Sequence, residues 1–283
     1  MRAPDPPLNP LGQRFLTSLA EEDLARIPAY NVTVIVAHPD DETIGCGATL
    51  KRLLGARVVI VANGVPNGSG DVGTAQTYAT ARWRELLAAL ELAGHKPSDV
   101  TGLSVTDRQA AEHLVAITRR LARGFAASGT AIALTHAYEG GHADHDAAAF
   151  AVHQAARLCR RLGQNVTVIE MPFYRAGGTG KVVQSFVAEE AGDSLTLSLD
   201  AESRELKERM LACFKSRSAF LTGFAVDVER FRIAPDYDFE ALPNDGNVLY
   251  DCQDSELAGR WCDLMTSARR QLSENHTPKW PLC

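Results

Sequence analysis

The sequence predicts an α/β fold: a Rossmann-like, doubly wound, mostly parallel sheet with helices on both faces and a C-terminal extension. Five short apolar runs alternate with helical stretches between residues 32 and 171, as in chains of βα units. The first run, residues 32–37, lacks polar alternation, which is typical of parallel strands buried on both faces. Polar side chains gather directly after two of these strands, at the sheet edge where open α/β folds bind ligands.

The expected elements follow in order along the chain. After a proline-rich arm, the sequence FLTSLAEEDLARI predicts a short helix over residues 15–27. The predicted strands are 32–37, 58–62, 100–105, 131–135 and 166–171. The predicted helices between them are 43–54, 74–93, 106–127 and 144–162, with Gly55 and Gly94 as stops and Thr106 as a cap.

Beyond Met171 the pattern changes. Two alternating runs, 182–188 and 194–199, predict a hairpin or edge strands, and helices are expected over 201–214 and 254–272 with an irregular aromatic stretch, 216–249, between them. No repeat or clean boundary divides the chain. We therefore expect a single domain over 1–283, made of an arm and short helix (1–29), a catalytic core (30–171) and an extension (172–283).

Composition excludes several classes of protein. The net charge of −6 argues against a nucleic-acid binder, and no apolar run approaches the roughly 18 residues of a membrane span. The N-terminus has no secretory h-region. The six cysteines are scattered, without a CxxC pair, so we expect reduced thiols in a cytoplasmic protein. The sequence carries no signal for the oligomeric state.

The most informative stretch is HPDDE, residues 38–42, directly after the first strand. Four of its five side chains bind protons or metals, and Pro39 stiffens the turn. Carboxylates are also favoured at a helix N-terminus, which offers a purely structural explanation for Asp41 or Glu42. It does not explain His38 and three acids at the end of a buried strand, so the sequence predicts a functional turn.

A second polar segment follows the fourth strand. In the strand order 3-2-1-4-5, strands 1 and 4 are neighbours that wind in opposite directions, and ligands bind between their carboxyl ends. HPDD would leave one side of this crevice and HADH, residues 142–145, the other. We therefore expect two segments about a hundred residues apart to meet at one site.

Two histidines and a carboxylate suit zinc and leave a coordination position open for water. We expect His38, Asp41 and His145 to hold one Zn²⁺ per chain, although other divalent metals suit the same ligands. Such an ion lowers the pKa of its water to about 7 and polarises a carbonyl oxygen. Asp40 is then placed to act as general base, and His142 to stabilise the oxyanion or protonate the leaving amine.

The remaining polar residues of the site region have more than one explanation. Asp144 is expected to orient an imidazole, or simply to cap its helix. His136 lies at the strand end but outside the HxxH spacing, so a role at the site and a structural role are equally favoured. Residues 63–73 form a glycine-rich loop without a GxGxxG motif or a P-loop lysine, which indicates a mobile lid.

At these residues the chain resembles the LmbE-like zinc de-N-acetylases. The motifs AHPDDE and HADH carry the resemblance, which covers roughly residues 30–170. This family includes the PIG-L type N-acetylglucosaminyl-phosphatidylinositol deacetylase and the deacetylases of mycothiol and bacillithiol synthesis. The resemblance implies zinc ligation by His38, Asp41 and His145. It also implies that Asp40 is the general base and that His142 assists the tetrahedral intermediate.

The resemblance extends to a helix and differs at one position. Arg82 begins an R-x-x-E-L pattern whose arginine the family associates with substrate, and Asp107 matches an acidic position that can hold sugar hydroxyls. On physical grounds alone, Arg82 and Glu85 are equally explained as a helix surface pair. Ala143 replaces the proline of the usual HPDH motif, a change that affects loop stiffness rather than the chemistry.

The predicted function is a zinc-dependent hydrolase that removes an N-acetyl or other N-acyl group from an amino sugar such as N-acetylglucosamine, or from its conjugate. An alternative is an amidase that acts on a thiol, glycopeptide or antibiotic conjugate with the same metal site. A non-catalytic nucleotide- or ligand-binding module is a third possibility, which predicts a phosphate-binding glycine loop. The expected partner is a small-molecule amino-sugar or glycoconjugate substrate.

Overall fold

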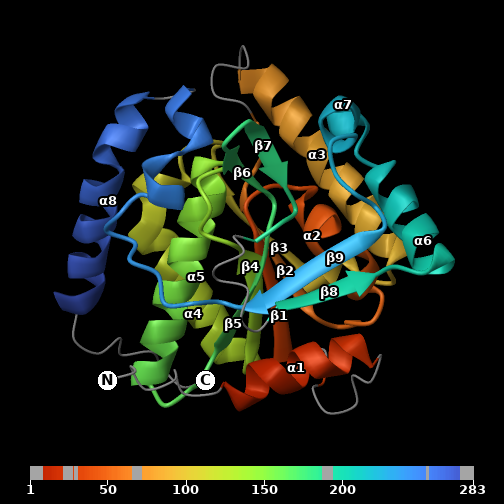
Figure 1. Ribbon diagram of the computed structural model, residues 1–283, viewed down its shortest axis with the longest axis horizontal. Coiled ribbons are helices and arrows are strands. Elements are labelled where there is room, and N and C mark those ends of the chain that lie inside the picture. Colours follow the sequence, from red (N-terminus) through yellow and green to blue (C-terminus); the bar gives the residue numbers. More distant parts are fainter. Residues whose placement is uncertain are drawn as a thin grey trace.

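The computed structural model describes residues 9–21, 28, 31–65, 72–186, 194–252 and 255–274. Its centre is a seven-stranded sheet of order β3-β2-β1-β4-β5-β9-β8 (Figure 1). The first five strands are parallel, which confirms the predicted fold class and the order 3-2-1-4-5. The strands are β1 Val32–Val36, β2 Arg57–Ala62, β3 Val100–Val105, β4 Ile132–His136, β5 Thr167–Met171, β8 Ser194–Ser198 and β9 Val228–Ile233.

Helices cover both faces of the sheet, as predicted (Figure 1). The layer on one face consists of α1 Pro10–Ala20, α2 Asp41–Leu50, α3 Val72–Leu92 and α6 Ala201–Leu211. The other layer consists of α4 Leu114–Ser128, α5 Ala143–Arg161 and α8 Ser255–Glu274. None of the helices in the described ranges is both long enough and apolar enough to cross a membrane.

The central strand β1 shows why the sheet is buried on both sides. Val32, Val34 and Val36 point into the cluster under α2 and α3, whereas Ile35 points into the cluster under α4 and α5, and all four are inaccessible to solvent. Successive side chains of a strand alternate between faces, so an unbroken apolar run satisfies two cores. Each such burial stabilises the fold by about 1.5–3 kcal/mol.

Three predicted helix boundaries were wrong. Helix α1 begins at Pro10 rather than residue 15, because the Asn9 side chain accepts a hydrogen bond from the Gly12 amide and proline suits the first helical turn. Helix α2 ends at Leu50, four residues early, in a series of turns. Thr106 caps no helix, since a turn and a 3-10 segment precede α4. Residues 22–27 of the first predicted helix lie outside the described residues.

The C-terminal extension differs more. The start of the predicted run at 182–188 belongs to β7 (Gly180–Val183), which forms a two-stranded hairpin with β6 (Tyr174–Gly177) rather than with the run at 194–199. Residues 187–188 lie outside the described residues. The expected irregular stretch contains β9, which lies antiparallel between β5 and β8. Its sequence VERFRI appears too charged for an internal strand, but ion pairs neutralise two of its buried side chains, Glu229 and Arg232.

The ion pair between β9 and α6 fixes the position of α2. The Lys207 ammonium lies 3.1 Å from Oε1 of Glu229, and both side chains are fully buried. The Glu229 carboxylate also accepts hydrogen bonds from the amides of Ala48 and Thr49, at 2.8 and 3.0 Å, and from the Thr49 hydroxyl. The extension thus holds the helix that begins within the HPDDE turn.

Lys207→Met is expected to destabilise the protein by about 3–5 kcal/mol, because it leaves the Glu229 carboxylate buried without a cation. Urea unfolding followed by circular dichroism measures this change. Lys215→Met, at an exposed position, is the matched control and should stay within about 0.5 kcal/mol of wild type. Adding Glu229→Gln to Lys207→Met should recover part of the loss. Equal stability of the two lysine variants would contradict the assignment.

Candidate active site

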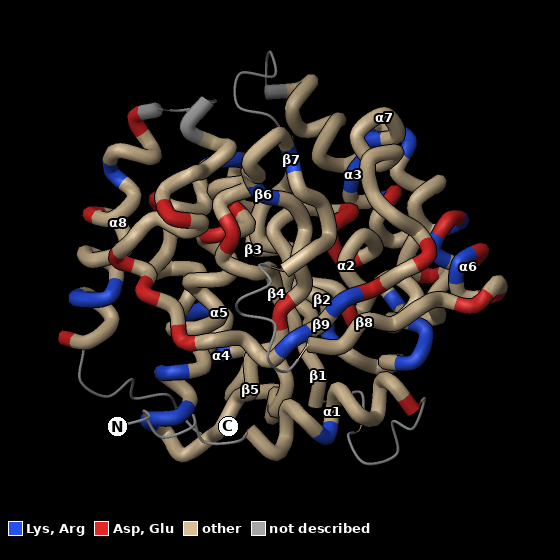
Figure 2. The backbone as a smooth tube through the Cα atoms, in the orientation of Figure 1, with Lys and Arg blue, Asp and Glu red and all other residues tan. Residues whose placement is uncertain are grey.

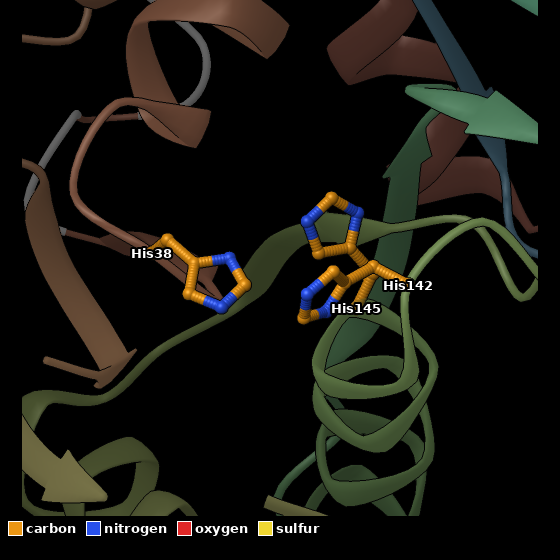
Figure 3. A group of neighbouring side chains, drawn as sticks. All are labelled: His38, His142 and His145. Carbon is orange, nitrogen blue, oxygen red and sulfur yellow. The ribbon is translucent and has the colours of Figure 1, made fainter. Parts of the chain in front are cut away.

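Two segments far apart in sequence converge at the carboxyl ends of β1 and β4. These strands pair in parallel, so the turn after β1 and the loop after β4 emerge at the same edge. His38 lies in the turn, and His142 and His145 lie at the start of α5 with their rings facing it (Figure 3). The ring centroid of His38 lies 4.7 Å from that of His142 and 5.5 Å from that of His145. The switch-point argument predicted this meeting.

His38 is surrounded by carboxylates. Its Nε2 lies 2.9 Å from Oδ1 of Asp107 and 3.1 Å from Oδ2 of Asp144, and its Nδ1 lies 3.3 Å from Oδ2 of Asp41. Burial alone would lower the pKa of His38, but the three carboxylates outweigh it and raise the pKa well above its usual value. The surroundings of this imidazole therefore favour a positive charge, which a proton or a metal ion supplies.

Asp41 lies between two imidazoles. Its Oδ2 is 3.3 Å from Nδ1 of His38 and 3.4 Å from Nε2 of His145, and it also accepts the His38 amide. Burial opposes ionisation, yet the surrounding imidazoles hold the pKa of this carboxyl well below its usual range. Asp41 is thus an ionised ligand candidate with an imidazole nitrogen on either side.

Asp40 faces a different set of groups. It precedes α2 with φ at 123°, a conformation that costs free energy for a residue other than glycine. Its Oδ2 accepts a 2.9 Å hydrogen bond from Nη2 of Arg82, and the Arg217 Nε lies 3.5 Å away. Burial raises the pKa of Asp40 to about 7, against the opposing charge of Arg82. The Asp40 carboxylate thus contacts two arginines, whereas the Asp41 carboxylate contacts imidazoles.

Hydrogen bonds assign the tautomers of two histidines. Nδ1 of His142 accepts from the Asp144 amide at 3.1 Å, so in the neutral ring the proton lies on Nε2, which can donate. Nε2 of His136 accepts from the Ala37 amide at 2.8 Å, so its lone pair is already committed. His142 is therefore a donor in this arrangement, and neither nitrogen that accepts these bonds is free to bind a metal.

Three sets of described residues place one potential ligand atom each within 4.8 Å of the others. They are His38–His142–His145, Asp41–His136–His145 and His38–Asp107–Asp144. The predicted trio of His38, Asp41 and His145 is not one of them, although Asp41 lies close to each of the two histidines. The structure places Asp41 close to both predicted histidine ligands, but the three ligand atoms do not all lie within 4.8 Å of one another.

Two separations within the predicted trio nevertheless suit zinc. Tetrahedral zinc with bonds of about 2.0–2.2 Å separates neighbouring ligand atoms by about 3.3–3.6 Å. The distances from Asp41 Oδ2 to His38 and His145, 3.3 and 3.4 Å, match this spacing. In addition, the buried Nδ1 of His145 has no hydrogen-bond partner among the described residues, so no hydrogen bond at this atom opposes metal binding by the ring. The donor set fits a divalent metal.

The remaining predicted residues also lie at the site. Asp144 accepts the amides of Arg108 and Ala110, at 2.7 and 3.0 Å, and thereby fixes the loop that carries Asp107. Arg82 is 3 % exposed, and its Nη groups donate to Asp40 and to the carbonyls of Pro39 and Gly64. Most of its donors are thus used within the protein. Most of the predicted lid, residues 66–71 of 63–73, lies outside the described residues.

Sequence reasoning missed contributions from the extension. Arg217 follows α6, and nothing in its sequence context points to Asp40. Tyr174 of β6 lies 5.5 Å from His145, ring centroid to centroid. A Cβ at Gly141 would come within 1.8 Å of the Tyr174 carbonyl oxygen, so a glycine is required where the hairpin crosses the loop. His136 had one usable signal, its position at the end of a buried strand.

Several solved structures that share this fold at low sequence identity are named as deacetylases. A deacetylase named for the pseudoaglycone of the antimicrobial reagent A40926 is 17% identical over 72% of this chain and 98% of its own, with a TM-score of 0.50. A deacetylase of teicoplanin biosynthesis is 16% identical over 73% and 98%, with a TM-score of 0.52. N,N'-diacetylchitobiose deacetylase from Pyrococcus horikoshii is 18% identical over 82% and 95%, with a TM-score of 0.50. These similarities establish the fold.

Comparison of sequences identifies a similar family. No curated protein matches the chain. The family model described as GlcNAc-PI de-N-acetylase, PIG-L, matches residues 33–156, which include both the HPDDE turn and the HADH segment. These residues carry every candidate metal ligand described above, and through them the chain is similar to the PIG-L family.

Proposed function

We propose that the protein is a metal-dependent hydrolase that removes an N-acetyl or other N-acyl group from an amino sugar such as N-acetylglucosamine, or from its conjugate. One observation carries the proposal: a carboxylate held by arginine, Asp40, directly precedes a carboxylate held by imidazoles, Asp41. Two adjacent acids in such different surroundings suit two tasks, proton transfer and metal binding. The PIG-L family match supports the same reading.

We assign the metal to His38, Asp41 and His145, with one Zn²⁺ per chain. When bound, a divalent ion of this kind polarises the amide carbonyl and makes water more acidic. A solved teicoplanin deacetylase with this fold was obtained in a zinc-inhibited form, at 16% identity and a TM-score of 0.50, so the metal must be identified by measurement.

The protein's own groups account for the proton transfers. Asp40 accepts the proton of the attacking water, and the Nε2–H of His142 donates to the oxygen that gains negative charge. The carboxylic acid of Asp40 then protonates the departing nitrogen as the C–N bond breaks. The products are a free amine and acetate, or the corresponding acid.

Three further residues position these groups. Arg82 fixes the carboxylate of Asp40 through Nη2, and Asp144 holds the loop of Asp107 through backbone amides. The Asp107 carboxylate lies 3.9 Å from Nε2 of His142 and is partly exposed, so it can reach a sugar hydroxyl beside the reacting amide. Arg82 is buried and already donates three hydrogen bonds to the protein, so its main role in this proposal is to position Asp40; a contact with substrate is left to its Nε–H and to the second hydrogen of Nη1.

The alternative substrate is a glycopeptide, antibiotic or thiol conjugate. One observation favours a larger substrate: beside His145, the ring of Tyr174 lies 6.2 Å from those of both Phe220 and Phe224. Such a group of rings suits a bulky apolar portion of the substrate. Two of the structural neighbours are named for antibiotic precursors or pathways.

For either substrate class, we propose that the protein acts in the cytoplasm.

The decisive test combines metal analysis with acetate release. Purified protein is expected to hold about one zinc per chain, to release acetate from a panel of N-acetylated amino sugars and glycopeptides, and to lose activity on chelation and regain it with zinc. Release from simple sugars alone would favour the first substrate class, and release from glycopeptides alone the second. Failure of the protein to bind any divalent metal would overturn the proposal.

A further inference from the structure

A second cavity lies away from the candidate active site. It has a volume of about 330 Å³ and lies between the C-terminal half of α5, helix α8 and the loop that contains Glu240. Gln154, which lines it, follows His145 by nine residues on α5, which corresponds to about 13 Å of helix. The cavity is therefore separate from the HPDDE and HADH groups.

The lining of this cavity is basic although the chain is acidic. Four arginines and one glutamate give it a net charge of +3, against −6 for the whole chain. The arginines are Arg157, Arg161, Arg269 and Arg270. Basic positions on both α5 and α8 are visible in Figure 2. Bringing like charges from two helices together costs free energy, and a bound anion offsets that cost.

Among the described residues, acidic side chains pair with the arginines of α8 but not with those of α5. Arg269 pairs with Glu240 at 2.6 Å, and Arg270 lies 3.8 Å from Glu274. Arg157 and Arg161, on the α5 side, form no ion pair with any acid of the described ranges. The guanidinium groups of α5 are thus available to a ligand.

A buried amide lines the same cavity. Gln154 is 7 % exposed, and its Nε2 has no hydrogen-bond partner among the described residues. A buried donor without a partner costs about 1–3 kcal/mol. An acceptor oxygen in the cavity would satisfy this donor, and the hydroxyl groups of Thr266 and Ser273 add further polar groups to the lining.

We propose that this cavity is a binding site for a small phosphate monoester. Phosphate offers three acceptor oxygens and a charge near −2, and arginine binds it with paired, charge-assisted hydrogen bonds. The volume is at the lower end of the range for small-molecule sites, which suits a compact ligand. Arg157 and Arg161 bind the phosphate, and Gln154 donates to one of its oxygens.

Calorimetric titration of the full-length, zinc-loaded protein with glycerol 3-phosphate tests this proposal. We expect saturable binding at one site per chain. Arg157→Gln/Arg161→Gln should weaken it at least about tenfold, since each charge-assisted hydrogen bond contributes about 1.5–3 kcal/mol. Gln154→Leu should weaken it about threefold or more. The matched control is Arg204→Gln/Arg209→Gln on α6, which removes the same charge from exposed positions and should change affinity less than twofold.

Three outcomes would overturn the proposal. No saturable binding at about 10 mM ligand, well above a Kd of 1 mM, would mean that no specific site exists. Equal weakening by both arginine pairs would indicate general attraction to basic surface. Binding that His145→Ala abolishes and Arg157→Gln/Arg161→Gln spares would place the phosphate at the candidate active site. Acetate release by the α5 variants, measured in parallel, keeps this test independent of the proposed function.

Discussion

Asp40→Asn is expected to lower kcat for deacylation by about 10²–10⁴-fold, while zinc content and the unfolding midpoint stay close to wild type. Asparagine has nearly the same shape and can still accept a hydrogen bond from Arg82, but it cannot take a proton from water. The loss should therefore appear in kcat rather than in KM. Steady-state kinetics on the best substrate of the panel, with metal analysis of the same sample, measures it.

The control for this variant is Asp263→Asn, an exposed aspartate on α8, which should retain full turnover. Asp40→Asn with wild-type kcat would exclude Asp40 as the general base. Loss of zinc together with activity would instead make Asp40 necessary for the metal site, because a pure base variant leaves the metal ligands intact.

His145→Ala is expected to remove both the metal and the activity. The variant deletes the imidazole whose Nε2 lies 3.4 Å from Asp41 Oδ2, and a site with two protein ligands holds zinc far more weakly than one with three. We expect less than about a tenth of the wild-type zinc content after dialysis, and acetate release reduced at least about 10³-fold. The contrast with Asp40→Asn separates metal binding from proton transfer.

Because His145 is buried and stacks on His136 with ring centroids 4.0 Å apart, the alanine leaves a cavity. His145→Gln keeps more of the volume and should fold normally while still losing zinc. His113→Ala is the control for histidine removal, because His113 is exposed at the end of the short 3-10 segment Ala110–His113. Full zinc content in His145→Gln would assign the third ligand elsewhere, with His142 the next candidate in the His38 set.

The parallel half of the fold was predictable because its strands carry a strong local signal. Unbroken apolar runs such as Val32–Val36 are buried on both faces, and helical periodicity fills the intervals. Strand β9 lacked that signal. The sequence predicted only an irregular stretch there, because its buried charges, Glu229 and Arg232, pair with Lys207 on α6 and Glu170 on β5, contacts that the local sequence does not reveal. In β9, ion pairs with other elements therefore stabilise a strand that its own sequence does not predict.

The site divides in the same way. The proximity of His38, Asp41, His142 and His145 was predictable because topology forces the ends of adjacent parallel strands together. Arg217 and Tyr174 reach the site through packing of the extension, which no spacing in the sequence encodes. The tautomers of His136 and His142 depend on single backbone amides, Ala37 and Asp144, and these contacts appear only in three dimensions.

The antiparallel pair β9–β8 has a consequence for self-association. Without it, β5 would end the sheet as an apolar strand with unpaired backbone groups, the arrangement that promotes aggregation between copies of a chain. The outermost strand is instead β8, five residues long, with Ser194, Thr196 and Ser198 facing solvent. A short hydroxyl-bearing edge is a poor template for another strand. The extension that contributes Arg217 to the site thus also protects the sheet from polymerisation at this end.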